Sequence, residues 1–302
     1  MQGIKIILCR QKLLFAHSFI LPANSPHKDR HNFVQKKGGR VTRFLYFCHT
    51  KCKMMSAKKK YSYDIEAQDI DFRRRVSLAS LTNFVLITAG KNADENGFGL
   101  LELQSDNFTW VLSRLVIDMK RMPTENDSLT IETWIEKIGT AFTTRNFRIF
   151  DGAGELIGYA ASSWAVMDMH TRRSVLLETL PTMLHFVIPE STPIGEPGRI
   201  PNVSGEVANT FKVKYSDIDV NNHANSLHYV EWLSDCFAPD FYRKHHIRRF
   251  EINFLKELTF GDSGEVYRQL KAPGDYAFQI VTRDKGIACR ARIVFEEVRP
   301  SI

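Results

Sequence analysis

The chain has 302 residues, of which 43% are hydrophobic and 25% charged, so its composition is that of a globular protein and not of a disordered or fibrous one. Its length suggests about two domains, and it lacks the run of about 18 apolar residues that a membrane-spanning helix needs. The net charge of +7 comes from the start of the chain: residues 1–53 carry 11 Lys and Arg against one acidic residue, whereas residues 54–302 carry 30 Lys and Arg against 33 Asp and Glu. A mildly acidic body argues against binding to a nucleic-acid backbone.

The leader, residues 1–53, shows no helical or strand periodicity beyond one turn. We therefore expect it not to be part of the fold, and the first interpretation is a misassigned start, with translation beginning at Met54 or Met55. A transit peptide is second, because the leader is basic and almost free of acid, and a secretory signal is third, because charges interrupt its apolar core. Cys48 and Cys52 lie in a CxxxC spacing, which without a second pair is weak support for a metal site.

The first patterned half of the chain predicts one helix and four strands. Apolar residues at helical spacing predict a helix over 77–89, ended by Gly90. Strand-like runs follow at 110–118, 128–138, 144–150 and 156–167. Five prolines between Pro181 and Pro201 then indicate a linker.

After the linker the same order recurs. A strand at 211–215 leads to a helix from Ser226 to about Phe237, and strands follow at 249–255, 265–270, 276–282 and 287–296. The two copies are offset by about 135 to 138 residues, and both helices are apolar over more than half of their circumference, so each needs cover on several sides.

This repeat predicts an α+β protein made of two tandem hotdog domains, in which a curved antiparallel sheet wraps around a long helix. We place the N-terminal hotdog at 58–180, the linker at 181–205 and the C-terminal hotdog at 206–302. Two generic α+β domains, each with its helix on one face of a sheet, are the structural alternative.

Three polar residues at alternate positions, Asp219, Asn221 and His223, precede the second predicted helix. In an extended segment alternate side chains point to the same side, so a carboxylate, an amide and an imidazole would converge. The N–H groups at the start of the helix would lie beside them, and together these groups could polarise a carbonyl and activate water. The alternative is helix capping, which needs only one residue, Asn225 or Ser226.

The first copy lacks this polar set. At an offset of 138 residues, Asn221 corresponds to Asn83, but Asp219 and His223 correspond to Leu81 and Val85. One chemical half and one apolar half would suit a substrate with a reactive head and an apolar tail.

The segment DIDVNNHANSLHYVEWL, residues 217–233, resembles the catalytic motif of acyl-acyl carrier protein thioesterases, the double-hotdog enzymes of plastids and bacteria. The resemblance extends from about Tyr61 to Glu296, through YSYDI (61–65), WVLSRLVIDMKRMPTENDSLTIETW (110–134), SSWAVMDMHTRR (162–173) and RRFEINFLKEL (248–258). It implies hydrolysis of the thioester of a fatty acyl-acyl carrier protein, with release of free fatty acid and carrier. It also implies a catalytic set of Asp219, Asn221, His223 and Glu257.

One departure from the family concerns the nucleophile. In plant members a cysteine once proposed as the nucleophile follows the glutamate, whereas here Leu258 follows Glu257. Cys236 falls in a predicted helix and Cys289 in the last predicted strand, where we expect buried structural thiols that fit a reducing compartment.

Direct attack by water is therefore the expected mechanism. His223 and a carboxylate, either Glu257 or Asp219, would hold and deprotonate the water, and Asn221 with helix N–H groups would stabilise the oxyanion. Sequence spacing does not decide between the two carboxylates.

By resemblance, the first copy forms the acyl-chain pocket and a basic rim receives the acidic carrier. The candidates for the pocket, for which a plain core role is the alternative, are Phe84, Phe98, Trp110 and Trp164. The candidates for the rim, for which a solvated strand end is the alternative, are Arg172, Arg173, Arg248 and Arg249.

The expected partner is acyl carrier protein with its acyl-phosphopantetheine, and we expect no cofactor, no metal, no nucleic acid and no membrane span. A homodimer is left open. The expected location is the bacterial cytoplasm, or the plastid if the leader is a transit peptide. The functional alternatives are a hotdog acyl-CoA thioesterase and a non-catalytic protein that binds acyl thioesters, and the intact catalytic set argues against the second.

Overall fold

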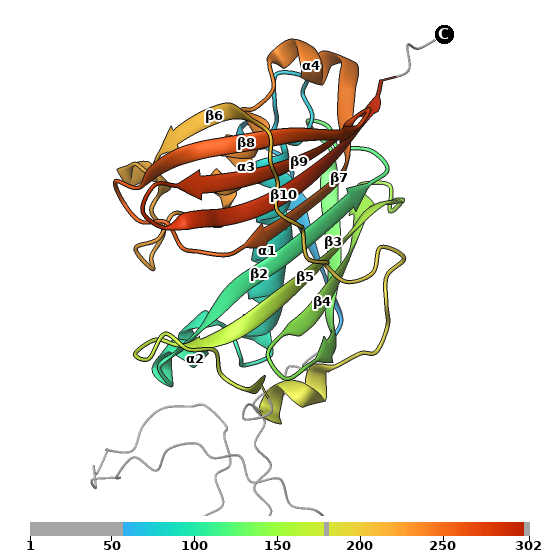
Figure 1. Ribbon diagram of the computed structural model, residues 1–302. Coiled ribbons are helices and arrows are strands. Elements are labelled where there is room, and N and C mark those ends of the chain that lie inside the picture. The colour runs from blue at the N-terminus through green and yellow to red at the C-terminus, as the bar shows by residue number, and fades with distance from the viewer. Residues whose placement is uncertain (1–56, 178–180, 299–302) are drawn as a thin grey trace, which may run out of the picture. The chain divides into compact units, whose positions relative to one another are not determined.

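The computed structural model describes residues 57–177 and 181–298 (Figure 1). The leader, residues 1–53, lies outside the described residues, so its expected dispensability stays a prediction. Within the described part of the chain, no helix is long and apolar enough to cross a membrane.

Each half of the chain supplies helices and strands in a similar order. The first half contains β1 (Lys59–Asp64), α1 (Leu78–Glu95), α2 (Leu100–Ser105), β2 (Phe108–Met119), β3 (Ser128–Ile138), β4 (Thr143–Asp151) and β5 (Leu156–Asp168). The second half contains β6 (Glu206–Lys212), α3 (Ser226–Ser234), α4 (Pro239–Lys244), β7 (His245–Phe254), β8 (Ser263–Ala272), β9 (Asp275–Thr282) and β10 (Gly286–Glu297). Short 3-10 turns are η1 (Ala67–Asp69), η3 (Pro181–Phe186) and η4 (Tyr215–Asp217).

The strands form one antiparallel sheet of ten, in the order β1-β3-β4-β5-β2-β7-β10-β9-β8-β6. The two halves meet where Arg114–Asp118 of β2 pairs with Arg249–Asn253 of β7. Helices α1 and α3 contact each other and lie on the same face of the sheet, behind the strands in Figure 1. This arrangement confirms the predicted pair of tandem hotdog domains.

Helix α1 begins where the sequence predicts but ends later. The Ser77 hydroxyl caps it by accepting the N–H of Ser80 at 3.0 Å. The expected stop at Gly90 is wrong, because the helix continues to Glu95. A glycine inside a helix costs only about 1 kcal/mol, and burial of Ala93 in the turn that follows offsets that cost.

Other differences concern the ends of elements and short elements. The strand expected at 211–215 is β6, which begins earlier, at Glu206, and ends at Lys212. It cannot reach 215, because Tyr215 already belongs to the turn η4. Helix α3 ends at Ser234 instead of near Phe237. The edge strand β1 and the short helices α2 and α4 were not among the predicted elements, and they are too short or too polar to give a clear period.

The larger of two hydrophobic clusters among the described residues extends through both hotdogs. It includes Leu81 and Phe147 from the first half together with Phe250 and Phe278 from the second. Since the two halves share a core and a sheet, the site that forms between α1, β2 and α3 is held from both sides.

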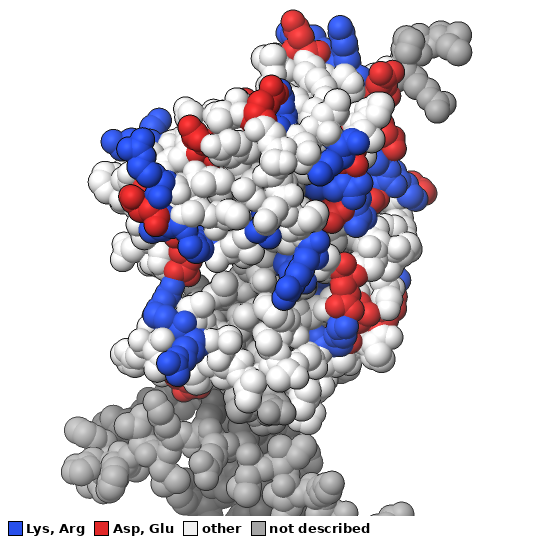
Figure 2. Space-filling model, in the orientation of Figure 1, with Lys and Arg blue, Asp and Glu red and all other residues white. Residues whose placement is uncertain are grey.

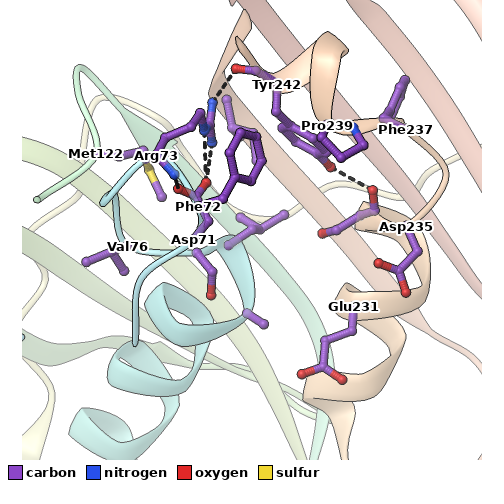
Figure 3. A pocket seen from close by; sticks show the side chains of 15 residues that line it. Asp71, Phe72, Arg73, Val76, Met122, Glu231, Asp235, Phe237, Pro239 and Tyr242 are labelled. Carbon is purple, nitrogen blue, oxygen red and sulfur yellow. Dashed lines mark hydrogen bonds and ion pairs between the residues drawn. The ribbon is translucent and has the colours of Figure 1, made fainter. Parts of the chain in front are cut away.

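Arg73 connects the two hotdogs near the start of α1, beside a pocket of 450 Å³ (Figure 3). Its Nη1 donates to the carbonyl oxygens of Tyr242 at 2.6 Å and His245 at 2.9 Å, while the Asp71 carboxylate accepts its Nε at 2.9 Å and its Nη2 at 2.6 Å. The guanidinium is mostly buried, so its loss would leave acceptors of both hotdogs unpaired.

We expect Arg73→Ala to lower the free energy of unfolding by about 2 to 3 kcal/mol, because hydrogen bonds to a charged group are lost and their acceptors stay buried. Arg243→Ala is the matched control: Arg243 and its partner Asp240 are both exposed, and their ion pair should be worth less than about 1 kcal/mol. Urea denaturation of both variants is the measurement. Equal losses would show that Arg73 does not connect the hotdogs.

Candidate active site

The loop before α3 is a closed turn. The Asp219 N–H donates to the His223 carbonyl at 2.8 Å, and the Asn222 N–H donates to the Asp219 carbonyl at 3.1 Å. Asn222 has a φ of +62°, a left-handed conformation that Asn tolerates better than most residues. The extended geometry expected from the sequence is therefore wrong, although Asp219, Asn221 and His223 do line one pocket.

Asp219 holds this loop together. Its Oδ1 accepts the backbone N–H of Asn221 at 2.8 Å and that of His223 at 3.3 Å. The capping function expected for Asn225 or Ser226 belongs to Asn225, whose Oδ1 accepts the Leu227 N–H at 3.0 Å. Capping thus explains Asn225 and leaves the other three polar residues for another purpose.

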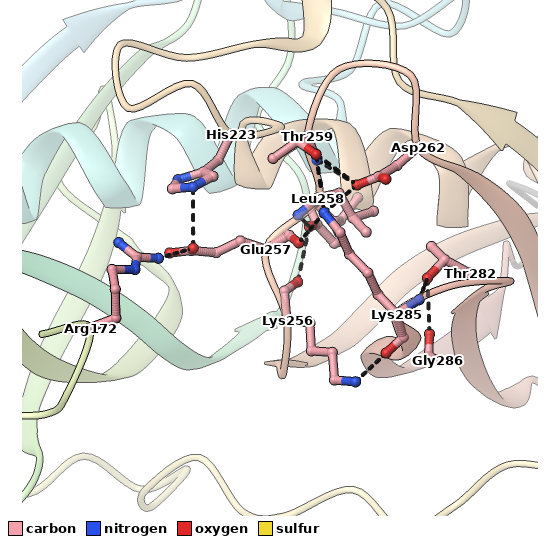
Figure 4. A network of polar contacts seen from close by, with 11 residues as sticks. Arg172, His223, Lys256, Glu257, Leu258, Thr259, Asp262, Thr282, Lys285 and Gly286 are labelled. Atoms are coloured by element: carbon pink, nitrogen blue, oxygen red, sulfur yellow. Dashed lines mark hydrogen bonds and ion pairs between the residues drawn. The ribbon is translucent and has the colours of Figure 1, made fainter. Parts of the chain in front are cut away.

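Glu257, in the loop after β7, faces the imidazole. Its Oε2 lies 3.2 Å from Nε2 of His223, and the same oxygen contacts Nη2 of Arg172 (Figure 4). The carboxylate next to His223 is therefore Glu257, whereas Asp219 serves the loop backbone.

Arg172 reaches this site from the other hotdog, in the turn after β5. The turn is shaped by Asp168, whose Oδ1 accepts the N–H groups of His170 at 2.9 Å and Thr171 at 2.7 Å. These backbone hydrogen bonds lower the pKa of Asp168. Arg172 itself has a φ of +56°. The resemblance suggested Arg172 for carrier docking, whereas in the structure its guanidinium forms an ion pair with the Glu257 carboxylate.

The loop that carries Glu257 is tied to α3 and to the turn between β9 and β10. The Leu258 carbonyl accepts the Ala224 N–H at 2.7 Å, and the Leu258 N–H donates to the Tyr229 hydroxyl at 3.1 Å. Nζ of Lys285 donates to the Glu257 carbonyl at 3.3 Å and to Asp262 Oδ2 at 2.6 Å (Figure 4). The Leu258 side chain is fully buried and does not line the pocket, so this position points into the core.

The two described cysteines are buried away from the pocket. Burial raises the pKa of Cys236 to about 12 and also raises the pKa of Cys289, so both are neutral thiols near pH 7. Neither lines the pocket that holds His223 and Glu257.

We expect the double variant Cys236→Ala and Cys289→Ala to hydrolyse thioesters within a few-fold of the parent rate, because no thiolate faces the pocket. Its thermal midpoint should fall, since two buried side chains are shortened. Steady-state kinetics with a thermal melt separates the two effects. A loss of about a thousand-fold, the scale of removing a nucleophile, would return a cysteine mechanism to consideration.

The polar residues open into two adjoining pockets. The first, of 560 Å³, contains Asp219, Asn221, His223 and Glu257. The second, of 360 Å³, shares Leu86, Trp110, Trp164 and Asn221 with the first and continues past Ala89, Gly90, Ala93, Leu100, Ile135 and Arg145. From Leu86 to Ala93, helix α1 rises about 10 Å, so the second pocket leads away from the polar site into the N-terminal hotdog.

The predicted lining residues divide into two pairs. Trp110 and Trp164 line both pockets, with their rings edge to face at 6.5 Å. Phe84 and Phe98 line neither pocket and pack in the core, which was the alternative for all four. Sequence reasoning missed Arg145, which is fully buried and donates to Asn92 Oδ1 at 2.7 Å; its charge within an otherwise buried strand was the available signal.

The predicted rim residues also lie apart. Arg173 is exposed beside Arg172. Arg248 and Arg249 both pair with Asp118 across the seam between β7 and β2, and neither lines the pocket. On the face seen in Figure 2, basic and acidic side chains are interspersed and do not form one basic patch.

Comparison with known proteins identifies the family. Models of the acyl-ACP thioesterase N-terminal domain and C-terminal domain match residues 56–179 and 202–297. The chain belongs to the acyl-ACP thioesterase family. A crystal structure of an acyl-ACP thioesterase from Bacteroides thetaiotaomicron superposes with a TM-score of 0.75 at 34% identity, over 80% of this chain and 98% of that one.

Plant members of the family are more distant. The 12:0-ACP thioesterase from Umbellularia californica superposes with a TM-score of 0.72 at 21% identity, over 80% of this chain and 98% of that one, which shows a common fold. The chloroplastic palmitoyl-acyl carrier protein thioesterase of Cuphea hookeriana is 24% identical over 66% of this chain and 51% of its own length. The chain spans about half the length of the curated relatives it matches.

Proposed function

We propose that this protein hydrolyses the thioester of fatty acyl-acyl carrier protein, releasing a free fatty acid and the carrier and so ending chain elongation in fatty acid biosynthesis. The observation that carries the proposal is the pair of His223 and Glu257, 3.2 Å apart, at the head of a pocket that continues past Trp110 and Trp164. A polar head and a largely apolar extension, whose polar members are Arg145, Asp94 and Thr143, match a thioester on an alkyl chain.

In this proposal Glu257 is the base. Its Oε2 contacts both His223 and Arg172. Its Oε1 makes no ion pair or hydrogen bond with the described residues, so this oxygen can hold a water. The water oxygen attacks the thioester carbon while Glu257 takes a proton. Asn221, with the N–H of the pocket-lining Ser226 at the start of α3, stabilises the oxyanion. The carbon–sulfur bond then breaks, and the proton passes to the leaving thiolate.

The direct test offers the purified full chain acyl thioesters of carrier protein and of coenzyme A, each over several chain lengths. Hydrolysis that favours the carrier thioester supports the proposal. A preference for acyl-CoA would indicate the acyl-CoA thioesterase instead, and binding without turnover would indicate a non-catalytic module. The free fatty acids that accumulate on expression in a bacterium would show the chain length.

Arg172 is proposed as a positioning residue, because it contacts the Glu257 oxygen that faces His223. We expect Arg172→Gln to lower kcat by about 10- to 100-fold, the scale of a misplaced catalytic group, on both acyl carrier protein and a small acyl-pantetheine. Arg173→Gln, the neighbouring exposed arginine, is the matched control and should leave kcat unchanged.

The same experiment separates positioning from docking. If Arg172 docks the carrier, its loss raises KM for the carrier substrate alone. Arg172→Lys should recover part of kcat, and in a Glu257→Gln background the loss of Arg172 should add little, because the two residues act through one contact.

The proposed partner is acyl carrier protein with its acyl-phosphopantetheine. Plant relatives such as that of Cuphea hookeriana are described as chloroplastic. A homodimer, and a location in the bacterial cytoplasm or the plastid, stay predictions that a sizing column and fractionation would check.

A further inference from the structure

Three arginines line one pocket on the outer face of the sheet, opposite the face that carries α1 and α3. Arg114 of β2, Asn253 of β7 and Arg290 of β10 are directly opposite one another in the strand register, so their side chains share a face. Asn253 accepts the Ile200 N–H of the linker at 2.8 Å, and the linker adds Arg199. The pocket has a volume of 440 Å³.

Within the described part of the chain, no carboxylate balances these charges. Among the described residues, Arg114, Arg199 and Arg290 form no ion pair with Asp or Glu, and no acidic residue lines the pocket. Arg114 donates only to the Pro197 carbonyl, at 3.4 Å, and Arg290 donates to the Ile200 carbonyl and to Gln279, both at 3.4 Å. These are long hydrogen bonds to neutral acceptors, so the guanidinium groups keep donors for an anion.

Two of the three arginines flank Asn253. The backbones of Arg114 and Arg290 lie two strands apart, about 10 Å. The Arg114 guanidinium is 5.8 Å from the Phe142 ring, and Arg290 reaches Gln279 of β9. An anion in the pocket that they line would neutralise their charges, and a phosphate matches the paired donors of arginine.

The arginine pocket adjoins the active-site pocket. Pairing between β2 and β7 ends at Arg114 and Asn253, and beyond this point Phe254 and Leu255 line both pockets. Glu257 follows Asn253 by four residues, which an extended chain spans in no more than about 14 Å. A ligand could therefore have one end at the arginines and the other at Glu257.

We propose that Arg114, Arg199 and Arg290 bind the phosphate of the phosphopantetheine arm, which reaches the thioester site where β2 and β7 part. From phosphorus to sulfur the arm has about 13 bonds, and a peptide chain with as many backbone bonds extends about 15 Å. This inference rests on the proposed function and adds the site for the arm. Because coenzyme A carries the same arm, the recognised group is the phosphate and not the carrier.

The test compares four thioesters of the same fatty acid: acyl-acyl carrier protein, acyl-CoA, acyl-phosphopantetheine and acyl-pantetheine. The last of these lacks the phosphate. The variants are Arg114→Gln, Arg290→Gln and Arg199→Gln, with the remote exposed Arg243→Gln as control. We expect Arg114→Gln and Arg290→Gln each to lower kcat/KM about ten-fold on the three phosphate-bearing substrates, mainly through KM, and to leave acyl-pantetheine unchanged.

Each contrary outcome is informative. Equal losses on acyl-pantetheine would show a structural role, and losses confined to acyl carrier protein would show recognition of the carrier surface; either overturns the proposal. A parent enzyme that does not distinguish acyl-phosphopantetheine from acyl-pantetheine also overturns it while leaving the proposed hydrolysis intact, whereas no hydrolysis of any substrate overturns the function itself. Arg199 is exposed and makes no hydrogen bond with the described residues, so Arg199→Gln should fold even if the other variants do not.

Discussion

Glu257→Gln should lower kcat on acyl-acyl carrier protein by about 10² to 10⁴, the range for removal of a general base, with little change in KM. The amide keeps the shape and the contact with His223 but cannot take a proton from water. His223→Ala should lower kcat by a factor in the same range, because the Glu257 carboxylate then loses the imidazole that lies 3.2 Å from its Oε2. KM should hold, because in our proposal the acyl chain and the carrier make their contacts elsewhere.

Single-turnover and steady-state kinetics on both variants, with circular dichroism as the folding check, are the measurements. The double variant should be no worse than the more damaged single variant, since the two residues form one unit. A well-folded Glu257→Gln enzyme with parental kcat would show that Glu257 is not the base. A well-folded His223→Ala enzyme with parental kcat would contradict the whole proposed mechanism.

Asp219→Ala should lower kcat by about 10², the cost of a small misplacement of catalytic groups, although Asp219 is not the base in our proposal. Its Oδ1 accepts two backbone N–H groups, and without them Asn221 and His223 lose their fixed positions. Asn221→Ala should cost about 10² to 10³ for a different reason, the loss of an oxyanion donor.

Asp219→Asn distinguishes the two possible functions of this carboxylate. The amide oxygen can still accept both N–H groups, so kcat should stay within about ten-fold of the parent if Asp219 holds the loop. A fall as large as that of Glu257→Gln would make Asp219 the base and Glu257 its support. Thermal melts of both Asp219 variants show whether the loop also contributes to stability.

The sequence alone determined the features that depend on local pattern. Apolar periodicity located α1, α3 and most strands, and the repeat of one helix followed by four strands predicted two tandem hotdogs, since each element buries one face at its own period. The motif at Asp219, Asn221 and His223, together with Glu257, was visible because its members lie close in the chain or match a family block. Leu258 after Glu257 was enough to argue against a cysteine nucleophile.

Tertiary structure decided which distant side chains meet. Arg172 and Glu257 are 85 residues apart, and no local period indicates that the turn after β5 reaches the loop after β7; the pairing of β2 with β7 brings the two hotdogs together there. That pairing, together with the pairing of β7 with β10, places Arg114 and Arg290 on either side of Asn253. Tertiary structure also decides that Phe84 packs in the core while Trp110 faces the pocket. The apolar pattern is the same for a core residue and a pocket-lining residue, and only the arrangement of neighbouring elements selects between them.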